Sequence, residues 1–350
     1  IGNPHQIQSI SNCFVIDSPH DSYGGILKTD QELVQIAKRR GGVGFDISSI
    51  RPKGENTGNC ARTTDGIEVF MDRYSNSCRE VAQGGRRGAL MITISVLHPQ
   101  VRDFIRIKRN LTRITGANLS VRLTDSFMHA VRDETEFKLQ WPVDSSEPVV
   151  TSTIDAKDLW HEIIESAHAC AEPGLLFWDN AKTMTPSDIY EDEGFGSVST
   201  NPCGEIILSP YDSCRLMLVN LKSFVLSPFT PSATFDYEKM GEVVQKAQRL
   251  MDDMIDLEIE QVDKILQKII DDPEPDSVKR TEREMWESIK SQALRGRRTG
   301  LGVTAVGDAV AALGIRYGSE ESIRTVETIY KCLSLNSYKS SCILAEERGS

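Results

Sequence analysis

Apolar and polar residues repeat with two different periods along the chain. Near-continuous apolar runs at residues 12–17 and 90–97 predict short buried strands. Residues 155–171 and 236–271 instead place apolar side chains at helical spacing, so both stretches predict amphipathic helices. Residues 30–40 begin acidic and end basic before two glycines, which is typical of a short capped helix. The chain therefore combines buried strands with amphipathic helices.

Polar stretches separate these elements. Residues 53–65 and 83–89 are polar and contain glycine, so we expect loops there. Residues 271–283 are charged and rich in proline, and they predict a mobile surface loop. Residues 300–305 match the G-x-G-x-x-A dinucleotide fingerprint, but no hydrophobic strand precedes them. A nicotinamide-dependent dehydrogenase is therefore disfavoured.

Composition and charge narrow the class of protein. The chain has 350 residues, of which 39% are hydrophobic and 26% charged, and this is enough for a sizeable core. A chain of this length is expected to form two domains. The net charge of −11 argues against direct nucleic-acid or anionic-membrane binding, which needs clustered positive charge. No run of 18 apolar residues and no signal-peptide pattern is present in the sequence, so we expect a cytoplasmic protein.

The eight cysteines are scattered and include no C-x-x-C pair. A disulfide framework is not expected in a long chain of this kind, and the sequence lacks the paired ligands of a zinc site, so no metal site is predicted. Helical patterns predict that Cys170, Cys332 and Cys342 are core residues, and we interpret Cys60 and Cys78 in the same way.

One short stretch carries chemistry rather than packing. Asn201-Pro202-Cys203-Gly204-Glu205 surrounds a thiol with an amide and a carboxylate, and its proline and glycine favour a tight loop. In an extended or turning backbone, residues at i−2, i and i+2 can point the same way. Asn201, Cys203 and Glu205 are therefore expected to converge as a catalytic group. A second thiol, Cys214, follows eleven residues after Cys203.

This stretch resembles the active-site finger loop of the ribonucleotide reductase large (catalytic) subunit. Further motifs of that family follow in its order along the chain: Ser11-Asn12-Cys13-Phe14, Gly41-Gly42-Val43-Gly44-Phe45, Ile50-Arg51-Pro52-Lys53-Gly54, Gln83-Gly84-Gly85-Arg86-Arg87-Gly88-Ala89, Pro173-Gly174-Leu175-Leu176-Phe177 and Arg298-Thr299-Gly300-Leu301-Gly302-Val303.

The resemblance implies a ten-stranded α/β barrel of the ribonucleotide reductase and glycyl-radical type. Residues 1–350 would form an incomplete barrel, with a first half-barrel at about 1–198, the finger loop at about 199–213 and the start of the second half at about 214–350. The family continues beyond this point, so we expect a fragment that is inactive without a C-terminal half. The resemblance also places the glycines at 300 and 302 at the start of a helix.

The resemblance assigns the chemistry of ribonucleotide reduction to five residues. A thiyl radical on Cys203 would remove hydrogen from C3′ of the ribose, while Glu205 acts as base toward the 3′-hydroxyl and Asn201 holds that oxygen. Cys13 and Cys214 would supply protons and electrons as the 2′-hydroxyl leaves as water, and would end as a disulfide. Such a pair requires α-carbons about 5.5–6 Å apart.

Ligand sites also follow from the resemblance. Ser11, Gly42 and Gly44 fall where the family lines its substrate site. The positions that hold the effector deoxynucleotide or ATP in the family correspond here to Asp21, Ser22, Lys38, Arg51, Arg86 and Arg87. A carboxylate suits a deoxyribose hydroxyl, and cations suit a triphosphate.

The sequence around Cys203 and the short spacing between Cys203 and Cys214 favour the adenosylcobalamin-dependent class of reductase. The alternative is a large subunit served by a separate di-iron or dimanganese radical subunit. The resemblance implies that the substrate is a ribonucleoside di- or triphosphate and that a thioredoxin or glutaredoxin is the reductant. It also implies a homodimer that makes precursors for DNA synthesis. A different class of function also stays open, namely a non-catalytic deoxynucleotide-binding or split-enzyme module.

Overall fold

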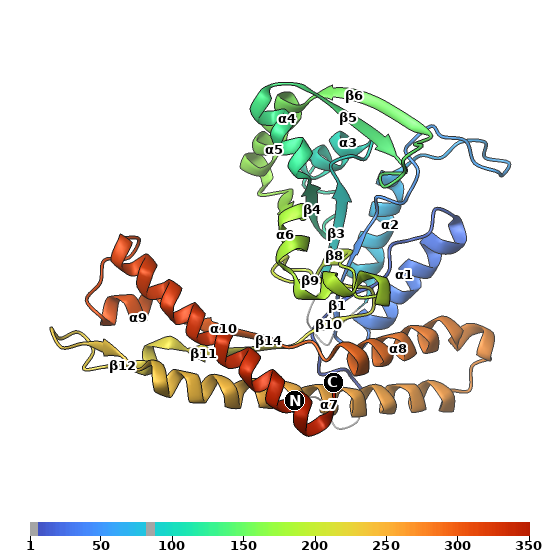
Figure 1. Cartoon of the computed structure of the whole chain (residues 1–350). Coiled ribbons are helices and arrows are strands. Elements are labelled where there is room, and N and C mark those ends of the chain that lie inside the picture. The colour runs from blue at the N-terminus through green and yellow to red at the C-terminus, as the bar shows by residue number, and fades with distance from the viewer. Residues whose placement is uncertain (1–5, 82–87) are drawn as a thin grey trace. The chain divides into compact units, whose positions relative to one another are not determined.

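The computed structural model describes residues 6–81 and 88–350 (Figure 1). Its internal contacts divide the chain into two compact units. The first comprises the chain up to Ser213 together with Gln261–Gly296, and the second comprises Cys214–Glu260 together with Arg297–Ser350.

The first unit contains five strands of a six-stranded sheet in the order β10-β1-β2-β3-β4-β7, and the edge strand β10 lies at the boundary between the units. Neighbouring strands from β1 to β7 pair in parallel. The strands of the sheet are β1 (Cys13–Val15), β2 (Gly42–Asp46), β3 (Leu90–Ser95), β4 (Asn118–Leu123), β7 (Gly174–Phe177) and β10 (Ser213–Cys214). Two antiparallel pairs lie outside it: β5 (Glu136–Trp141) with β6 (Val150–Asp155), and β8 (Ser199–Thr200) with β9 (Ile207–Leu208).

Helices connect the strands of the first unit. They are α1 (Tyr23–Ala37), α2 (Ile67–Glu80), α3 (Val101–Arg106), η1 (Ile107–Arg109), α4 (Asp125–Asp133), α5 (Ala156–Cys170), α6 (Trp178–Met184), η2 (Pro186–Glu193) and α8 (Asp276–Gly296). The predicted helix at 155–171 is confirmed as α5, which the Asp155 side chain caps by accepting a hydrogen bond from the Asp158 amide.

The six-stranded sheet has two chemically different faces. Successive side chains of a strand point to opposite faces, and the parallel register aligns equivalent residues across strands. We call one side the apolar face: Phe14, Val43, Phe45, Ile92, Ile94, Leu119 and Val121, all part of one buried core. We call the other side the polar face: Gly42, Gly44, Asp46, Thr93, Ser95, Ser120 and Arg122. One face therefore forms part of the hydrophobic core, and the other presents glycine and polar side chains.

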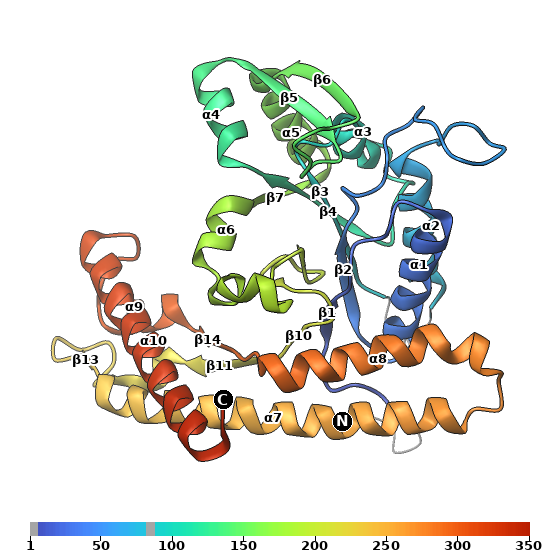
Figure 2. The same ribbon diagram turned by 45° about the vertical axis from the view of Figure 1, so that its right-hand side comes forward.

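Helices α1 and α2 lie on the apolar side of the sheet, opposite the hairpin of β8 and β9 (Figure 2). Helix α8 packs beside α1, and its fully buried Trp286 meets Phe14 edge to face with ring centroids 5.9 Å apart. Burial of these large side chains supplies the main stabilisation of the unit.

Two helix boundaries differ from the sequence-based expectation. Helix α1 begins at Tyr23 rather than near residue 30, because the Ser22 side chain caps it by accepting a hydrogen bond from the Gly25 amide at 3.1 Å. The loop expected at 271–283 is confined to residues 272–275, because α7 ends at Asp271 and α8 begins at Asp276 and buries Met285 and Trp286. Packing of this apolar stripe outweighs the charged, proline-rich sequence before it.

The second unit has its own core. It contains β11 (Leu216–Asn220), η3 (Leu221–Phe224), β12 (Val225–Leu226), β13 (Thr234–Phe235), β14 (Gly300–Thr304), α9 (Val306–Ala312) and α10 (Glu320–Arg348), and the predicted long helix α7 (Tyr237–Asp271) runs from it into residues of the first unit. Strands β11 and β14 pair in parallel, and β12 and β13 pair antiparallel.

The glycines at 300 and 302 lie within β14, so they open no nucleotide-binding helix, and the expectation that they start a helix is wrong. A Cβ at Gly300 would stand 2.5 Å from the Arg215 carbonyl oxygen, so close pairing with β11 explains this glycine.

Cys78 is buried as predicted, whereas Cys60 and Cys342 are exposed and Cys170 and Cys332 are half-buried. The helical pattern placed Cys342 on the wrong side of α10. Among the described residues, no helix is both long and apolar enough to cross a membrane.

Candidate active site on the polar face of the sheet

Residues 198–208, which we call the finger hairpin, carry the predicted catalytic stretch. Strands β8 and β9 pair Ser199 with Leu208 and Thr200 with Ile207. Across the turn, the Asn201 amide donates to the Ile206 carbonyl oxygen at 3.2 Å, and the Gly204 amide donates to the Asn201 carbonyl oxygen at 3.0 Å. Gly204 has a φ of +81°, a conformation that glycine adopts without strain. The proline and glycine thus form the tight loop that the sequence predicted.

The finger hairpin lies directly against the polar face. A Cβ on Gly44 would stand 1.8 Å from the Thr200 carbonyl oxygen, and a Cβ on Gly42 would stand 2.8 Å from Pro202 Cγ. Asn118 on β4 donates from Nδ2 to the Pro202 carbonyl oxygen at 2.8 Å. Both glycines predicted to line the substrate site therefore make room for the hairpin. Their contact with substrate stays a prediction.

Cys203 and Glu205 are both exposed at the tip of the hairpin, whereas Asn201 is fully buried beneath them. Asn201 Oδ1 accepts a hydrogen bond from the Ile206 amide at 3.3 Å. Its Nδ2 has no hydrogen-bond partner among the residues that the structure describes. A buried amide with an unused donor is uncommon, and it is suited to holding an oxygen atom of a ligand.

Electrostatics links three of the predicted residues. Partial burial of the thiol raises the pKa of Cys203, and negative charge at Glu205 and then at Cys13 acts in the same direction. Cys13 is half-buried at the start of β1, where its Cα pairs with Gly42. The structure therefore brings Cys203, Glu205 and Cys13 into one electrostatic environment. At neutral pH, the sulfur of Cys203 keeps its hydrogen.

Cys214 and Ser11 lie in the segments around β1. Cys214 is the second residue of β10, the strand next to β1 in the sheet. Just before it, the Val15 amide donates to the Asp212 carbonyl oxygen at 3.1 Å, and the Tyr211 amide donates to the Val15 carbonyl oxygen at 2.8 Å. Ser11 is buried two residues before Cys13. The disulfide pairing of Cys13 with Cys214 stays a prediction.

The residues predicted to bind the effector fall into two places. Asp21 accepts hydrogen bonds from the Arg51 amide at 3.0 Å and from Arg51 Nε at 2.7 Å, and Ser22 caps α1 beside them. Lys38 lies at the other end of this 15-residue helix, about 22 Å away, and pairs with Glu282 at 2.7 Å. Arg86 and Arg87 lie outside the described residues.

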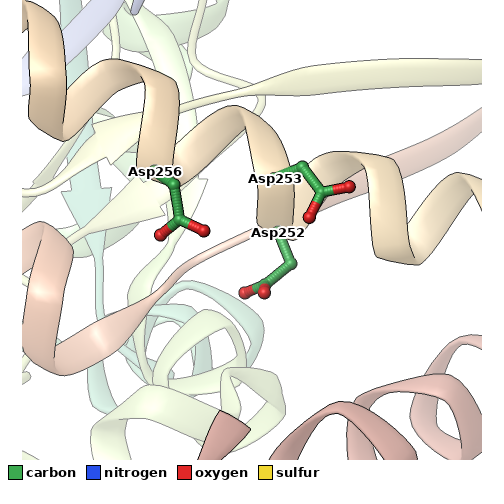
Figure 3. A group of neighbouring side chains, drawn as sticks. All are labelled: Asp252, Asp253 and Asp256. Carbon is green, nitrogen blue, oxygen red and sulfur yellow. The ribbon is translucent and has the colours of Figure 1, made fainter. Parts of the chain in front are cut away.

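Acidic residues also gather on α7 in the second unit. Figure 3 shows Asp252, Asp253 and Asp256 together, and their carboxylate oxygens lie within 4.8 Å of one another. Arg297 contacts Asp252 at 2.7 Å and Asp256 at 2.8 Å, and Arg348 contacts Asp252 at 2.5 Å and Asp253 at 2.7 Å. Partial burial acts to raise the pKa of Asp252, but the two arginines outweigh it and lower the pKa. This cluster is therefore an ion-pair network.

Sequence reasoning missed four residues that contact the finger hairpin or one another beneath it: Asp46, Thr93, Asn118 and Arg122. A signal was present in the sequence. Each lies in an otherwise apolar strand, at even spacing from another polar or glycine residue of that strand. Two-residue spacing of this kind indicates a strand with one polar face.

A family model and several known proteins match this sequence. The family model described as "Ribonucleotide reductase, barrel domain" matches residues 11–350. The chain is 30% identical over 343 residues to a vitamin B12-dependent ribonucleoside-diphosphate reductase of Mycobacterium tuberculosis, covering 97% of this chain and 44% of the relative. It is 31% identical over 347 residues to the protein of that name from Thermoplasma acidophilum, covering 98% and 40%.

A ribonucleoside-diphosphate reductase large subunit of variola virus is 26% identical over 366 residues, covering 97% of this chain and 44% of the relative. The chain thus spans less than half the length of each of these three relatives.

Proposed function

Because the chain belongs to the ribonucleotide reductase barrel-domain family, we propose that it is the catalytic part of an enzyme that converts ribonucleotides to 2′-deoxyribonucleotides. One observation carries this proposal. The finger hairpin presents Cys203 and Glu205 at its tip, with Asn201 below them and Cys13 close enough to influence the thiol. An exposed thiol, an exposed carboxylate and a buried amide with an unused donor, all within five residues, support a chemical role for this stretch.

Cys203 is the proposed hydrogen-abstracting residue. Its raised pKa keeps the hydrogen on sulfur, so the group can give up a hydrogen atom and take one back. In the proposed reaction the sulfur radical removes the 3′-hydrogen of the ribose and returns a hydrogen to C3′ at the end. Cys203 is therefore unchanged after each turnover.

Glu205 and Asn201 act on the 3′-oxygen in this proposal. The exposed carboxylate of Glu205 takes the proton of the 3′-hydroxyl, which is the task of a general base. Asn201 donates from its unused Nδ2 to the same oxygen and so fixes its position. Both groups lie within two residues of Cys203, which supports a shared site.

Cys13 and Cys214 are the proposed reductants. Two thiols give up two protons and two electrons in total, and a disulfide bond forms between them. The 2′-carbon–oxygen bond breaks, the oxygen leaves as water, and a hydrogen replaces it on C2′. The position of β10 next to β1 supports this pairing. A thioredoxin- or glutaredoxin-type protein would then reduce the disulfide.

The names of two relatives favour vitamin B12 as the radical source. When bound, adenosylcobalamin would supply the oxidant that removes a hydrogen atom from a thiol. The exposed, protonated Cys203 thiol fits that demand, and beside it a Cβ at Gly204 would meet, among residues 6–81 and 88–350, only Met91 Cε, at 3.7 Å. We assign no residue of this chain to holding the cobalamin itself.

We also propose a substrate, an effector site and an assembly. The relatives are named as diphosphate reductases, so a ribonucleoside diphosphate is the proposed substrate. The Asp21–Arg51 pair beside the Ser22 cap is the proposed contact for a deoxynucleotide or ATP effector in a homodimer.

Reconstitution tests the function. The chain would be combined with the segment that completes the length of its relatives, adenosylcobalamin, a dithiol and a ribonucleoside diphosphate, and deoxynucleotide formation measured. We expect product with the native residue and none with Cys203→Ser. Cys342→Ser, which changes another exposed cysteine, serves as the control and should keep full activity.

Product formed with a separate di-iron subunit instead of cobalamin would keep the reaction and replace the radical source. Deoxynucleotide binding without turnover under either condition would refute the catalytic proposal and favour a binding module.

A further inference from the structure

The finger hairpin cannot hold its own position. Its two strands have two residues each, and isolated hairpins of this size are not stable in water. The placement of Cys203 at the tip must therefore come from contacts between the stem of the hairpin and the sheet. The residues beneath the stem decide where the thiol stands.

An ion pair lies at the centre of these contacts. Arg122 on β4 meets Asp46 on β2, with Nε 3.0 Å from Oδ2, and both side chains are largely buried. Arg122 Nη1 donates to the Val198 carbonyl oxygen in the hairpin stem at 3.0 Å. The guanidinium also lies over the Trp178 ring, 4.7 Å from its centroid, which fixes its plane.

A chain of hydroxyl groups makes the second connection. Thr93 Oγ1 donates its only hydrogen to Asp46 Oδ2 at 2.8 Å. Thr93 Oγ1 also lies 3.0 Å from Ser199 Oγ, so Ser199 must be the donor in that bond. The hydrogen bonds therefore run in one direction, from Ser199 through Thr93 to the Asp46 carboxylate. Charge assistance strengthens such a chain.

The Asp46 carboxylate thus reaches the stem by two routes. Thr93 connects it to the Ser199 side chain, and Arg122 connects it to the Val198 carbonyl oxygen. Its other oxygen accepts a hydrogen bond from the Ser48 amide at 2.9 Å, which holds the carboxylate in place. Residues 198 and 199 lie five and four positions before Cys203.

We propose that Asp46, Thr93 and Arg122 are positioning residues that hold the stem of the finger hairpin and thereby set the position of Cys203. The proposal rests on the proposed function of Cys203, but it concerns the order of the hairpin and can be measured without turnover. None of the three touches the thiol, and the link through Ser199 makes their effect specific to this hairpin.

Hydrogen exchange of the hairpin amides tests the proposal in the full chain. The amides of Val198 and Asn201 donate to the carbonyl oxygens of Leu208 and Ile206, so their exchange reports opening of the hairpin. Ser199→Ala and Thr93→Val remove one hydroxyl each and leave the ion pair in place. We expect Ser199→Ala to accelerate exchange of these amides about fivefold, as loss of one hydrogen bond would, and Thr93→Val, which removes two hydrogen bonds, to accelerate it at least as much.

A matched control separates positioning from general stability. Ser166 on α5 is also fully buried and donates its hydroxyl to the Ile105 carbonyl oxygen at 2.8 Å, away from the hairpin. Ser166→Ala removes an equivalent bond and should leave the hairpin amides unchanged. Thr93→Ser keeps the hydroxyl and should restore slow exchange. These two variants distinguish loss of the link from loss of folding.

Alkylation of Cys203, read by mass spectrometry of its peptide, gives a second measure. Opening of the hairpin would remove the remaining burial that raises the pKa of the Cys203 thiol, so Ser199→Ala should modestly raise its rate of alkylation relative to that of Cys60.

Unchanged exchange in both Thr93→Val and Ser199→Ala, or equal acceleration in Ser166→Ala, would overturn the positioning role. Absence of Cys203-dependent product in reconstitution would refute the proposed reaction instead. The two failures are thus distinguishable.

Discussion

The two faces of the six-stranded sheet are both covered by protein, yet opposite principles hold them. The apolar face is filled by large side chains such as Phe45, which packs edge to face on Tyr74 with centroids 4.9 Å apart. The neighbouring residue Gly44 faces the other way, where the absence of a side chain admits the Thr200 carbonyl oxygen. The apolar face therefore stabilises the fold mainly through burial of large side chains. On the polar face, the missing side chain of glycine and directed hydrogen bonds determine the geometry of the site.

The largest effect should come from emptying the apolar face. Phe45 is fully buried, so Phe45→Ala is expected to lower the free energy of unfolding by about 3–5 kcal/mol, through lost burial and the cavity left behind. Urea-induced unfolding measures this change, and Phe45→Leu should cost less because it retains volume. A loss below about 1 kcal/mol for the alanine variant would show that the sheet can collapse around the gap.

Acid should act on stability through the fully buried His98, three residues after β3. Burial lowers the pKa of His98 from 6.5 to about 4, and its Nε2 lies 2.9 Å from the Ile50 carbonyl oxygen. The Gln100 amide donates to Nδ1, so the proton of the neutral ring is on Nε2.

The unfolded chain binds a proton near pH 6.5, while the folded chain resists it down to about pH 4. The stabilising contribution of His98 is therefore present above pH 6.5 and is lost as the pH falls through this window, by up to about 3 kcal/mol. Unfolding measured from pH 7 to pH 4 should show this loss. His98→Gln should flatten it, whereas His161→Gln, at an exposed histidine, should leave it intact.

Filling the polar face should have a smaller effect on stability and a larger one on the site. Gly44→Ala introduces a Cβ 1.8 Å from a backbone oxygen, so the finger hairpin must move. Overpacking of this kind costs about 1–3 kcal/mol. We expect faster hydrogen exchange at Val198 and Asn201, with protection of the apolar core retained. Unchanged exchange of the hairpin would contradict the close approach of Thr200 to β2.

The smallest effect concerns charge at the tip. Partial burial and then Glu205 raise the pKa of Cys203, so Glu205→Gln removes the second cause and should move the pH dependence of Cys203 alkylation modestly toward lower pH. The free energy of unfolding should stay the same, because Glu205 is exposed. A shift toward higher pH would mean that Glu205 acts on the thiol by another route.

The apolar face was predictable from sequence, because hydrophobic periodicity is a local property. The strand at 90–97 and the helices at 155–171 and 236–271 are confirmed as β3, α5 and α7. The expected incomplete α/β barrel agrees with the half-barrel sheet and with the family match. Errors arose where packing overrode composition, as at α8.

The polar face was predictable only in part. Asn201, Cys203 and Glu205 share a short stretch, so their spacing is enough to predict that they converge, and this convergence stays a prediction. The link from Asp46 through Thr93 to Ser199 joins residues 47 and 106 positions apart. Only the pairing register of the strands brings these groups together, and a single sequence does not state that register. Lys38 illustrates the same point, because its distance from Asp21 depends on the length of α1.

A mutational scan of Gly44 and Phe45 would reveal the difference between the two faces of the sheet. Both positions should reject nearly every substitution, but for opposite reasons: Phe45 tolerates only residues that fill the same volume, whereas Gly44 tolerates no volume at all. A similarity matrix would rate Gly44→Ala as mild and Phe45→Ala as severe. Rejection of alanine at a strand glycine thus marks, from variant data alone, a position where another backbone rests on a sheet.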